Sequence, residues 1–374
     1  MADSVLALAE HPPEHPTERK KLYKAAQKLM FSVESTYELE HRVYYGGILL
    51  YVANVAIDLG IFKALADTHS SGLSAHELAK AVCGEELLVS RITRGLAAYG
   101  LVDINPSGLY TANANTHRFT DPGVESGVHH NVLNMFPAIH SLPQWLRTHD
   151  MQSPTDVHDT AFQLGFNTKD EPFTWFAAHP ENLQAGAAFM SAQRADQKGW
   201  IEDDTIFPSQ DLTLSPTDLA ANRVLFIDIG GGVGHQSIAL RTHRPNLQGR
   251  ILLQDLPHTL ALADTTRLLA LDIETMSYDC HTPQPIAGAK AYYMRNVLHD
   301  WTDSIALTFL RNQRSAMADD SVLIIDEMVV KDPGSTWQQV NIDIAMMAAM
   351  GSLERTEAQW RALLGDFRGA GLIA

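Results

Sequence analysis

The chain has 374 residues, which is long enough for two domains that each bury a hydrophobic core. Its hydrophobic content of 45% and charged content of 19% are typical of a globular protein, and its net charge of −16 argues against a nucleic-acid backbone as partner. Cys83 and Cys280 show no metal-type spacing and suit a reducing compartment, and no segment approaches the roughly 20 apolar residues that span a bilayer. We therefore expect a cytoplasmic protein without a metal site, a nucleic-acid partner or a membrane span.

The first part of the chain predicts a helical domain. Residues up to about Pro16 are polar and rich in proline, which indicates a loose tail, and Lys20–Tyr45 then shows helical periodicity. Gly46–Ala66 is apolar almost all round and predicts a helix that is buried on every side. Such a helix belongs either to the core or under a partner subunit.

Residues 73–111 predict a winged helix. Ser74 and Glu77 form a capping box before a short helix, Glu86–Tyr99 forms a second helix, and two short strands follow around a turn. The second helix carries only Arg91 and Arg94 as basic residues. A structural or dimerisation role is therefore favoured over DNA binding.

Residues 128–200 are helical with loops. The aromatic side chains of Phe162–Phe176 are expected mostly in the core, with one or two at the wall of a pocket. His130 and Arg194 are isolated polar residues that, taken alone, indicate a surface or structural role. Thr205–Asn222 reads as a linker, so we expect an N-terminal domain over residues 1–204 and a second domain over residues 223–374.

After the linker, strands and helices alternate, which is typical of an α/β fold with a doubly wound parallel sheet. Ligands in such folds bind at the carboxyl ends of the strands. The predicted strands are Val224–Ile229, Arg250–Gln254, Ala291–Arg295 and Val322–Asp326.

The first of these strands runs into a glycine-rich turn that opens a helix. Gly230, Gly232 and Gly234 let the backbone approach a ligand, and Asp228 precedes the turn. The G-x-G-x-G spacing is one residue shorter than the pyrophosphate-binding pattern and fits a ligand that has a ribose but no phosphate. A purely structural turn is the alternative, but Asp255 ends the next strand about twenty residues later, where a carboxylate accepts both ribose hydroxyls.

Several ordered motifs together resemble the plant and fungal class of S-adenosylmethionine (SAM)-dependent O-methyltransferases. They are the glycine loop, Asp255-Leu256-Pro257, Ser277–Pro285, Ala291–Asp303, Ile324–Met328 and Gly351–Trp360. The resemblance covers nearly the whole chain and implies a Rossmann-like SAM-binding sheet with an N-terminal winged-helix dimerisation domain. It also implies a homodimer whose N-terminal helices interlock.

The resemblance implies roles for individual residues. His299 would be the general base that takes a hydroxyl proton, and Glu327 and Glu354 would flank and orient it. SAM would be held by the glycine loop, by Asp255 and Leu256 at the ribose, by Asp279 and Cys280 at the adenine, and by Arg295 nearby. The substrate would meet Asn296 and a helix that carries Met346, Met347 and Met350, although a methionine stripe can also be plain core.

Two departures from the family pattern stand out. Cys280 replaces an aromatic residue that usually follows the adenine-binding acid, so the packing beneath the adenine is expected to differ. The chain also ends at Gly371-Leu372-Ile373-Ala374, where family members continue into two last strands that complete the sheet. A sheet short of those strands would expose an unpaired edge.

A rival interpretation stays open because fold does not determine reaction. Some fungal proteins similar to these methyltransferases bind SAM without consuming it and act as pericyclases on 2-pyridone or polyketide intermediates. In those proteins a histidine and arginines polarise the substrate, and His130, Arg194 and Arg295 stand where such groups would converge. The retained His299, Glu327 and Glu354 favour methyl transfer to a hydroxyl group of an aromatic or enolic small molecule.

Overall fold

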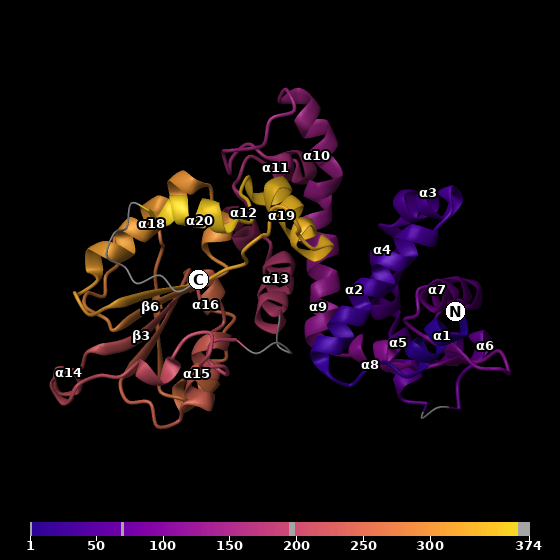
Figure 1. Ribbon diagram of the computed structural model, residues 1–374, viewed down its shortest axis with the longest axis horizontal. Helices are drawn as coiled ribbons and strands as arrows, with labels where there is room; N and C mark the ends of the chain where they lie inside the picture. Colours follow the sequence, from indigo (N-terminus) through magenta and orange to yellow (C-terminus); the bar gives the residue numbers. More distant parts are fainter. Residues whose placement is uncertain (1, 69–70, 194–198, 366–374) are drawn as a thin grey trace. The chain divides into compact units, whose positions relative to one another are not determined.

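The computed structural model describes residues 2–68, 71–193 and 199–365, and the chain forms two compact units, Met1–Thr111 and Ala112–Ala374 (Figure 1). This division differs from the boundary expected near residue 204. The helices between residues 112 and 192 belong with the second unit, since two of them, Phe136–Thr148 and Ala161–Phe166, pack against α19 (Trp337–Met350), which follows the last strand of the sheet. No helix in the described ranges is long and apolar enough to cross a membrane.

The first unit is built from seven helices and a short hairpin among its described residues. The helices are α1 (Ala2–Glu10), α2 (Pro16–Val33), α3 (Thr36–Tyr45), α4 (Ile48–Leu59), α5 (Ile61–Ala66), α6 (Ala75–Ala81) and α7 (Glu86–Ala98). The hairpin pairs β1 (Asp103–Ile104) antiparallel with β2 (Tyr110–Thr111). The predicted helix–helix–hairpin order and the capping box of Ser74 and Glu77 are confirmed.

Two secondary-structure predictions for this unit were wrong. The predicted loose tail contains α1, whose alanines and leucines favour a helix despite the prolines that follow. The predicted single helix over Gly46–Ala66 is broken at Gly60, which takes the left-handed conformation at φ 76° and separates α4 from α5. Within one chain, α4 also buries only one side. The structure describes all of its residues, and those that are buried are Ala53 and Ala56.

The second unit contains the parallel sheet. Its five described strands are β3 (Val224–Ile229), β4 (Arg250–Asp255), β5 (Ile273–Ser277), β6 (Ala291–Arg295) and β7 (Val322–Asp326), in the order β5-β4-β3-β6-β7. Every neighbouring pair is parallel, which confirms the predicted α/β fold. The unpaired sheet edge that we expected depends on residues 371–374, which lie outside the described residues.

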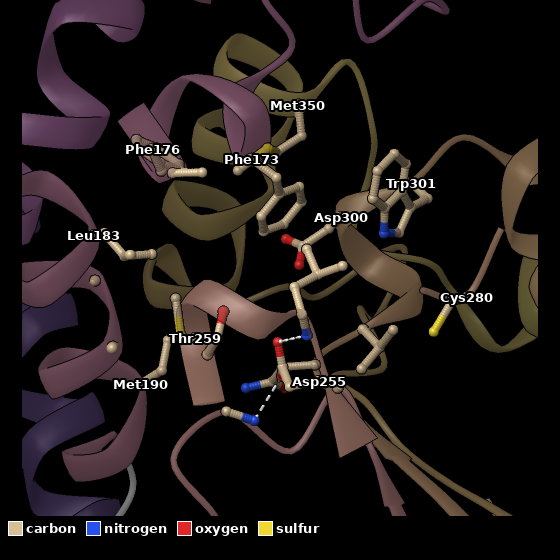
Figure 2. A pocket seen from close by; sticks show the side chains of 18 of the residues that line it. Phe173, Phe176, Leu183, Met190, Asp255, Thr259, Cys280, Asp300, Trp301 and Met350 are labelled. Atoms are coloured by element: carbon tan, nitrogen blue, oxygen red, sulfur yellow. Dashed lines mark hydrogen bonds between the residues drawn. The ribbon is translucent and has the colours of Figure 1, made fainter. Parts of the chain in front are cut away.

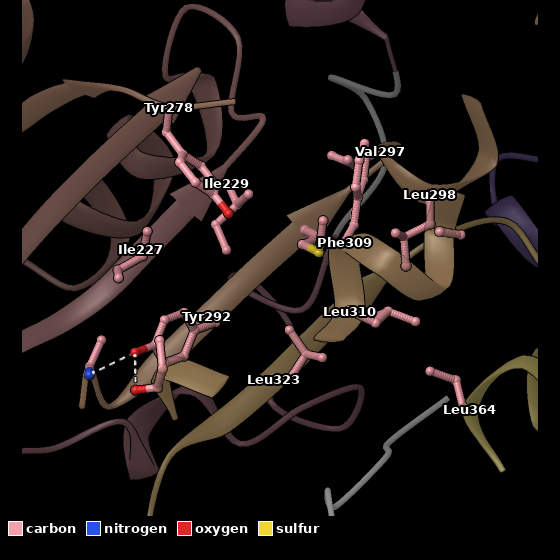
Figure 3. Packing of buried hydrophobic residues seen from close by; sticks show 14 of the residues in the cluster. Ile227, Ile229, Tyr278, Tyr292, Val297, Leu298, Phe309, Leu310, Leu323 and Leu364 are labelled. Atoms are coloured by element: carbon pink, nitrogen blue, oxygen red, sulfur yellow. Dashed lines mark hydrogen bonds between the residues drawn. The ribbon is translucent and has the colours of Figure 1, made fainter. Parts of the chain in front are cut away.

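Helices cover both faces of this sheet (Figure 1). On one face α18 (Asp303–Ala316) and α20 (Glu357–Leu364) pack on Ile227 and Tyr292, and Figure 3 shows this cluster. On the other face α15 (His235–His243) and α17 (Thr265–Ala270) pack on Phe226 and Tyr293. Adjacent residues of β3 and β6 thus point to opposite faces, and all of β3 is buried, as expected for a central parallel strand.

A helical layer follows the first unit in sequence and joins the sheet through α19. It consists of α8 (Ala114–Arg118), α9 (Pro122–His130), a π-helical turn (Asn131–Met135), α10 (Phe136–Thr148), α11 (Ala161–Phe166), α12 (Pro172–Ala178) and α13 (Pro180–Ala192). A third core cluster joins α10, α11 and α12 to α19 through Trp145, Phe162, Phe176 and Met350. Short helical segments at Ser209–Asp211, Pro216–Ala220, Pro257–Leu260 (α16) and Leu298–Asp300 complete the described elements. The expected linker over residues 205–222 contains buried residues, Ser209 and Leu212.

Candidate active site

A cavity of about 720 Å³ lies in the second unit, at the carboxyl ends of the strands. One end is formed by the glycine loop, Asp255 and residues 278–281, and the other by α12, α13 and α19. Figure 2 shows Phe173, Phe176, Leu183, Met190 and Met350 around it, with Asp255 and Asp300 among these apolar side chains. The cavity is therefore mostly apolar with a few acidic groups, which is typical of a small-molecule site.

The glycine loop and Asp255 form one continuous hydrogen-bonded surface (Figure 2). The Asp255 carboxylate accepts the N–H of Gly232 at 2.8 Å and its neighbour Leu256's N–H at 2.7 Å. Gly232 has a φ of 62°, and nothing lies within 4 Å of the position that a Cβ would take there. These bonds fix the carboxylate while leaving lone pairs free for ligand hydroxyls. The surface therefore fits the ribose of a nucleoside cofactor.

Asp228 and Gly234 do not line the cavity formed by the described residues. Asp228 is buried and accepts the backbone N–H of Ser237 at 3.2 Å and its hydroxyl at 2.8 Å; burial raises the pKa of this carboxyl group to about 6. A Cβ at Gly234 would lie within 3.0 Å of Leu253 and Leu268. Both residues shape the loop by holding α15 against β4.

Asp279 and Cys280 line the cavity beside Tyr278. The Asp279 carboxylate accepts the N–H of His281 at 2.9 Å. Burial, with the nearby Asp255 and Asp279, raises the pKa of the Cys280 thiol to about 12, so this group stays protonated at neutral pH. The place at the adenine that the family resemblance implies for these two residues stays a prediction.

Arg295 and Asn296 line the cavity at the end of β6. An Arg295 N–H donates to Nε2 of His235 at 3.0 Å, and the Asn296 amide donates to the side chain of Gln193 at 3.0 Å. Burial and the Arg295 charge lower the pKa of His235 to about 4, so its ring is neutral. His235 also lines the cavity, and the sequence analysis missed it although it directly follows the glycine loop.

The structure brings His299 and Glu354 together. Nδ1 of His299 lies 2.6 Å from Oε1 of Glu354, and both side chains are buried. Although burial lowers it, the surrounding carboxylates of Asp300, Glu354 and Glu327 raise the pKa of His299 to about 10. The backbone N–H of Glu354 donates to Asp343 at 2.9 Å, which fixes this acid at the end of α19.

Glu327 is placed differently from the role that the family resemblance implies. Its Oε1 accepts the backbone N–H groups of Val297 and Leu298 at 2.9 and 2.8 Å, while its Oε2 is buried without a described partner. Burial raises the pKa of this carboxyl group to about 7, against the attraction of His299. Glu327 therefore acts on His299 by charge and by holding the preceding backbone.

Asp300 is a site residue that the sequence analysis missed. It lines the cavity, and its Oδ1 lies 3.4 Å from Nε2 of His299. Burial raises the pKa of its carboxyl group to about 6 although His299 opposes the rise. Its position directly after His299 was the signal available. Beside it, Trp301 stacks on Phe173 with ring centroids 5.5 Å apart.

The proposed substrate residues divide into three groups. His130, Met346 and Met350 line the cavity, and Met346 and Met350 also belong to the buried core of α19. Nδ1 of His130 faces the Asn134 amide nitrogen at 2.9 Å, and burial lowers the pKa of this ring to about 4. Met347 packs against the same core cluster. Arg194 lies outside the described residues.

Comparison with known proteins identifies the chain. Residues 176–371 match the O-methyltransferase domain, and residues 45–121 match the O-methyltransferase dimerisation domain. The chain belongs to the O-methyltransferase family. It is thus an enzyme of the family whose cofactor is SAM.

Fungal O-methyltransferases are among its relatives. O-methyltransferase lepI of Aspergillus flavus is 36% identical over 346 residues, which cover 92% of this chain and 87% of the relative. Demethylsterigmatocystin 6-O-methyltransferase of the same organism is 35% identical over 342 residues, which cover 90% of this chain and 84% of the relative. The relatives thus include enzymes of fungal secondary metabolism.

Two solved structures align over nearly the whole chain. A structure described as a pericyclic reaction enzyme has a TM-score of 0.87 and 33% identity, covering 98% of this chain and 92% of that chain. A LepI variant in complex with S-adenosylhomocysteine (SAH) and a substrate analogue has a TM-score of 0.88 with the same identity and coverage. Both members of this O-methyltransferase family share the fold of the present chain.

Replacing Gly232 with alanine is expected to weaken SAH binding by roughly tenfold or more, because the Cβ would occupy the open space at the cavity surface. Calorimetric titration with SAH measures the effect. Gly288→Ala is a matched control, since Gly288 has a φ of 68°, equally open surroundings and no place in the cavity wall. Equal losses of SAH affinity in both variants would show that backbone strain, not contact with the cofactor, is responsible.

Proposed function

We propose that this O-methyltransferase family member transfers a methyl group from SAM to the hydroxyl group of an aromatic or enolic small molecule. The observation that carries the proposal is one continuous cavity that joins Asp255, at the cofactor end, to Asp300, whose carboxylate lies 3.4 Å from the ring of the buried His299–Glu354 pair. SAM supplies a methyl group that its sulfonium already activates. The chain must then orient the hydroxyl group and hold the proton that it loses.

Residues of the chain fit these tasks. Asp255 and the glycine loop would hold the ribose, and Asp279 and Cys280 would lie at the adenine. Phe173, Trp301 and two methionines of α19, Met346 and Met350, would enclose a flat apolar substrate and exclude water. The acid–base cluster around His299 would take the proton.

The test is a mass-resolved assay with SAM and a panel of phenolic and 2-pyridone compounds, followed for SAH and methylated product. We expect both to form with the wild-type enzyme and both to be lost in His299→Ala. A His140→Ala variant is a control, because His140 is exposed on α10 and does not line the cavity. Turnover of a panel compound with SAM left intact would contradict methyl transfer.

A second candidate function is a pericyclic rearrangement that does not consume SAM, and the environment of His130 favours it. The Asn134 amide nitrogen also donates to the Asn182 carbonyl, and its oxygen accepts from the Asn182 side chain, which fixes the amide orientation. Nδ1 of His130 is therefore an acceptor, and Nε2 carries the proton of a neutral ring in the cavity wall. Such a donor, with Arg295, would polarise a substrate carbonyl. A product of unchanged or dehydrated mass, lost in His130→Ala and Arg295→Ala, would support this function.

We also infer a homodimer, in the cytoplasm, formed through the dimerisation domain. None of the residues of α2 and α3, all of which the structure describes, is buried within one chain. Leu29, Phe31, Val33 and Val43 are among their exposed apolar side chains, and so large an apolar surface favours a covering partner. Sedimentation as a monomer at micromolar concentration would contradict the dimer.

A further inference from the structure

Three buried glutamine side chains form a chain of hydrogen bonds that ends at the wall of the cavity. Gln254 lies on β4, Gln284 lies in the loop before β6, and Gln313 lies on α18, with exposed fractions of 0, 7 and 0%. The amides of Gln254 and Gln284 bond to each other reciprocally, with both N···O distances at 2.9 Å. Nε2 of Gln284 also donates to Oε1 of Gln313 at 2.8 Å, and Nε2 of Gln313 donates to the hydroxyl group of Tyr278 at 3.0 Å. This amide chain therefore joins β4 and α18 to Tyr278, which lines the cavity.

Main-chain groups fix the direction of the bonds in the amide chain. Oε1 of Gln284 accepts the backbone N–H of Ile286 at 3.1 Å, so Nε2 of Gln284 faces Gln313 as a donor. At the other end, the Tyr278 hydroxyl group donates to the carbonyl of Thr282 at 2.9 Å and uses a lone pair to accept from Gln313. Because an N–H group closes one end and a carbonyl group the other, no amide can flip without losing a hydrogen bond.

The amide chain lies among apolar side chains. Tyr278 belongs to the buried cluster on this face of the sheet, together with Leu252 and Phe309, and Met276 packs against it. Figure 3 shows Tyr278 beside Ile229 in this cluster. Burying an amide costs free energy unless its hydrogen bonds are made, and apolar side chains would fill the same space without that cost. A fully bonded polar chain instead fixes one arrangement of the segments that it joins.

The amide chain connects the two loops at the cofactor end of the cavity. The backbone carbonyl of Gln254 accepts two N–H groups of the glycine loop, from Gly230 at 2.8 Å and from Gly231 at 3.2 Å. At its other end, the Tyr278 hydroxyl group bonds across the loop of residues 278–282, the 278–282 loop. The side-chain bonds between Gln254 and Tyr278 thus hold the glycine loop and the 278–282 loop at a fixed distance.

The 278–282 loop carries Asp279, the acid expected at the adenine amino group. Its Oδ1 accepts the N–H of His281 at 2.9 Å, and its second oxygen remains an acceptor for a ligand. Since an ionised carboxylate only accepts hydrogen bonds, it favours a purine with a 6-amino group and repels one with a 6-carbonyl group. Such discrimination requires the carboxylate to be held to within about 0.5 Å by its supporting residues.

We propose that the amide chain positions the 278–282 loop against the glycine loop and so lets the site select adenine over purines that lack a 6-amino group. Gln254, Gln284 and Gln313 are positioning residues, since they act through Tyr278 and do not line the cavity that the described residues form. The proposal rests on the expected place of the adenine at Asp279 and not on the reaction that follows. A binding assay therefore tests it even if the proposed methyl transfer fails.

The test compares two ligands by calorimetric titration of the full-length enzyme. They are SAH and S-inosylhomocysteine, in which a carbonyl oxygen replaces the 6-amino group. The wild-type enzyme should bind SAH roughly 10- to 100-fold more tightly, as expected for a hydrogen bond to a charged group. Gln284→Met keeps the length of the side chain and removes its amide. In this variant the preference for SAH should fall roughly fivefold or more, mostly through weaker SAH binding.

Tyr278→Phe removes only the last hydroxyl group of the chain, and the preference for SAH should fall in this variant as well, which decides the matter if Gln284→Met does not fold. Tyr292→Phe is the matched control, because the Tyr292 side chain is also buried and its hydroxyl group donates to the Ile286 carbonyl at 2.8 Å, but it does not line the described cavity. Circular dichroism shows whether each variant is folded. An unchanged preference in either folded variant, an equal loss in Tyr292→Phe, or a wild-type enzyme that binds both ligands alike would overturn the proposal.

Discussion

Replacing Arg355 with alanine is expected to lower the free energy of unfolding by about 3 kcal/mol, because buried carbonyl groups would lose their donor. The side chain is fully buried and donates to the carbonyl oxygens of Leu298 and Trp301, each at 2.8 Å. It also lies over the Trp360 ring, 5.1 Å from its centroid. The ion pair with Asp303 adds little, since that carboxylate is 63% exposed.

Chemical denaturation followed by circular dichroism measures the effect of this substitution. Arg361→Ala is the matched control, because Arg361 is 74% exposed and pairs only across one helical turn with Glu357 among the described residues, so a loss below about 0.5 kcal/mol is expected. Methyl transfer should fall in Arg355→Ala as well, since the bonded carbonyls flank His299 and Asp300. Equal stability of the two variants would show that the turn is held by other contacts.

The sheet was largely predictable from the sequence because its central strands are continuous apolar runs. The bounds of β3, β6 and β7 agree with the prediction, and β4 extends one residue further, to Asp255. β5 was missed because it lies at the edge of the described sheet and buries only Ile273 of Ile-Glu-Thr-Met-Ser. Such a strand has no hydrophobic run, and only its pairing with β4 defines it.

The cofactor end of the site was more predictable than its acid–base cluster. The role of Asp255 could be predicted because it ends a strand, and parallel topology brings the end of that strand beside the glycine loop. The hydrogen-bond partner of Glu327 could not be predicted from the spacing of the motifs. Its Oε1 accepts two backbone N–H groups after β6 instead of bonding to the imidazole. Asp300 and His299 are adjacent in sequence, and only the three-dimensional turn decides which of them faces the cavity.

Glu354→Gln is expected to reduce kcat/KM for methyl transfer roughly 100-fold or more, because the imidazole loses the carboxylate that orients it and stabilises its charged form. The substitution keeps the shape of the side chain but removes the negative charge 2.6 Å from Nδ1 of His299. The pKa of His299 should therefore fall, because a neutral amide does not stabilise the imidazolium form. SAH affinity should stay close to that of wild type, because Glu354 does not line the cavity formed by the described residues.

Steady-state kinetics across pH, with SAH titration as a check on folding, tests this expectation. Glu357→Gln is the control, since Glu357 lies three residues further on, is 63% exposed and pairs with Arg361 on the surface. A rate for Glu354→Gln within about twofold of Glu357→Gln would mean that the His299–Glu354 pair has no part in proton transfer. The cavity would then owe its chemistry to His130 and Arg295, and the pericyclic function would be the one to pursue.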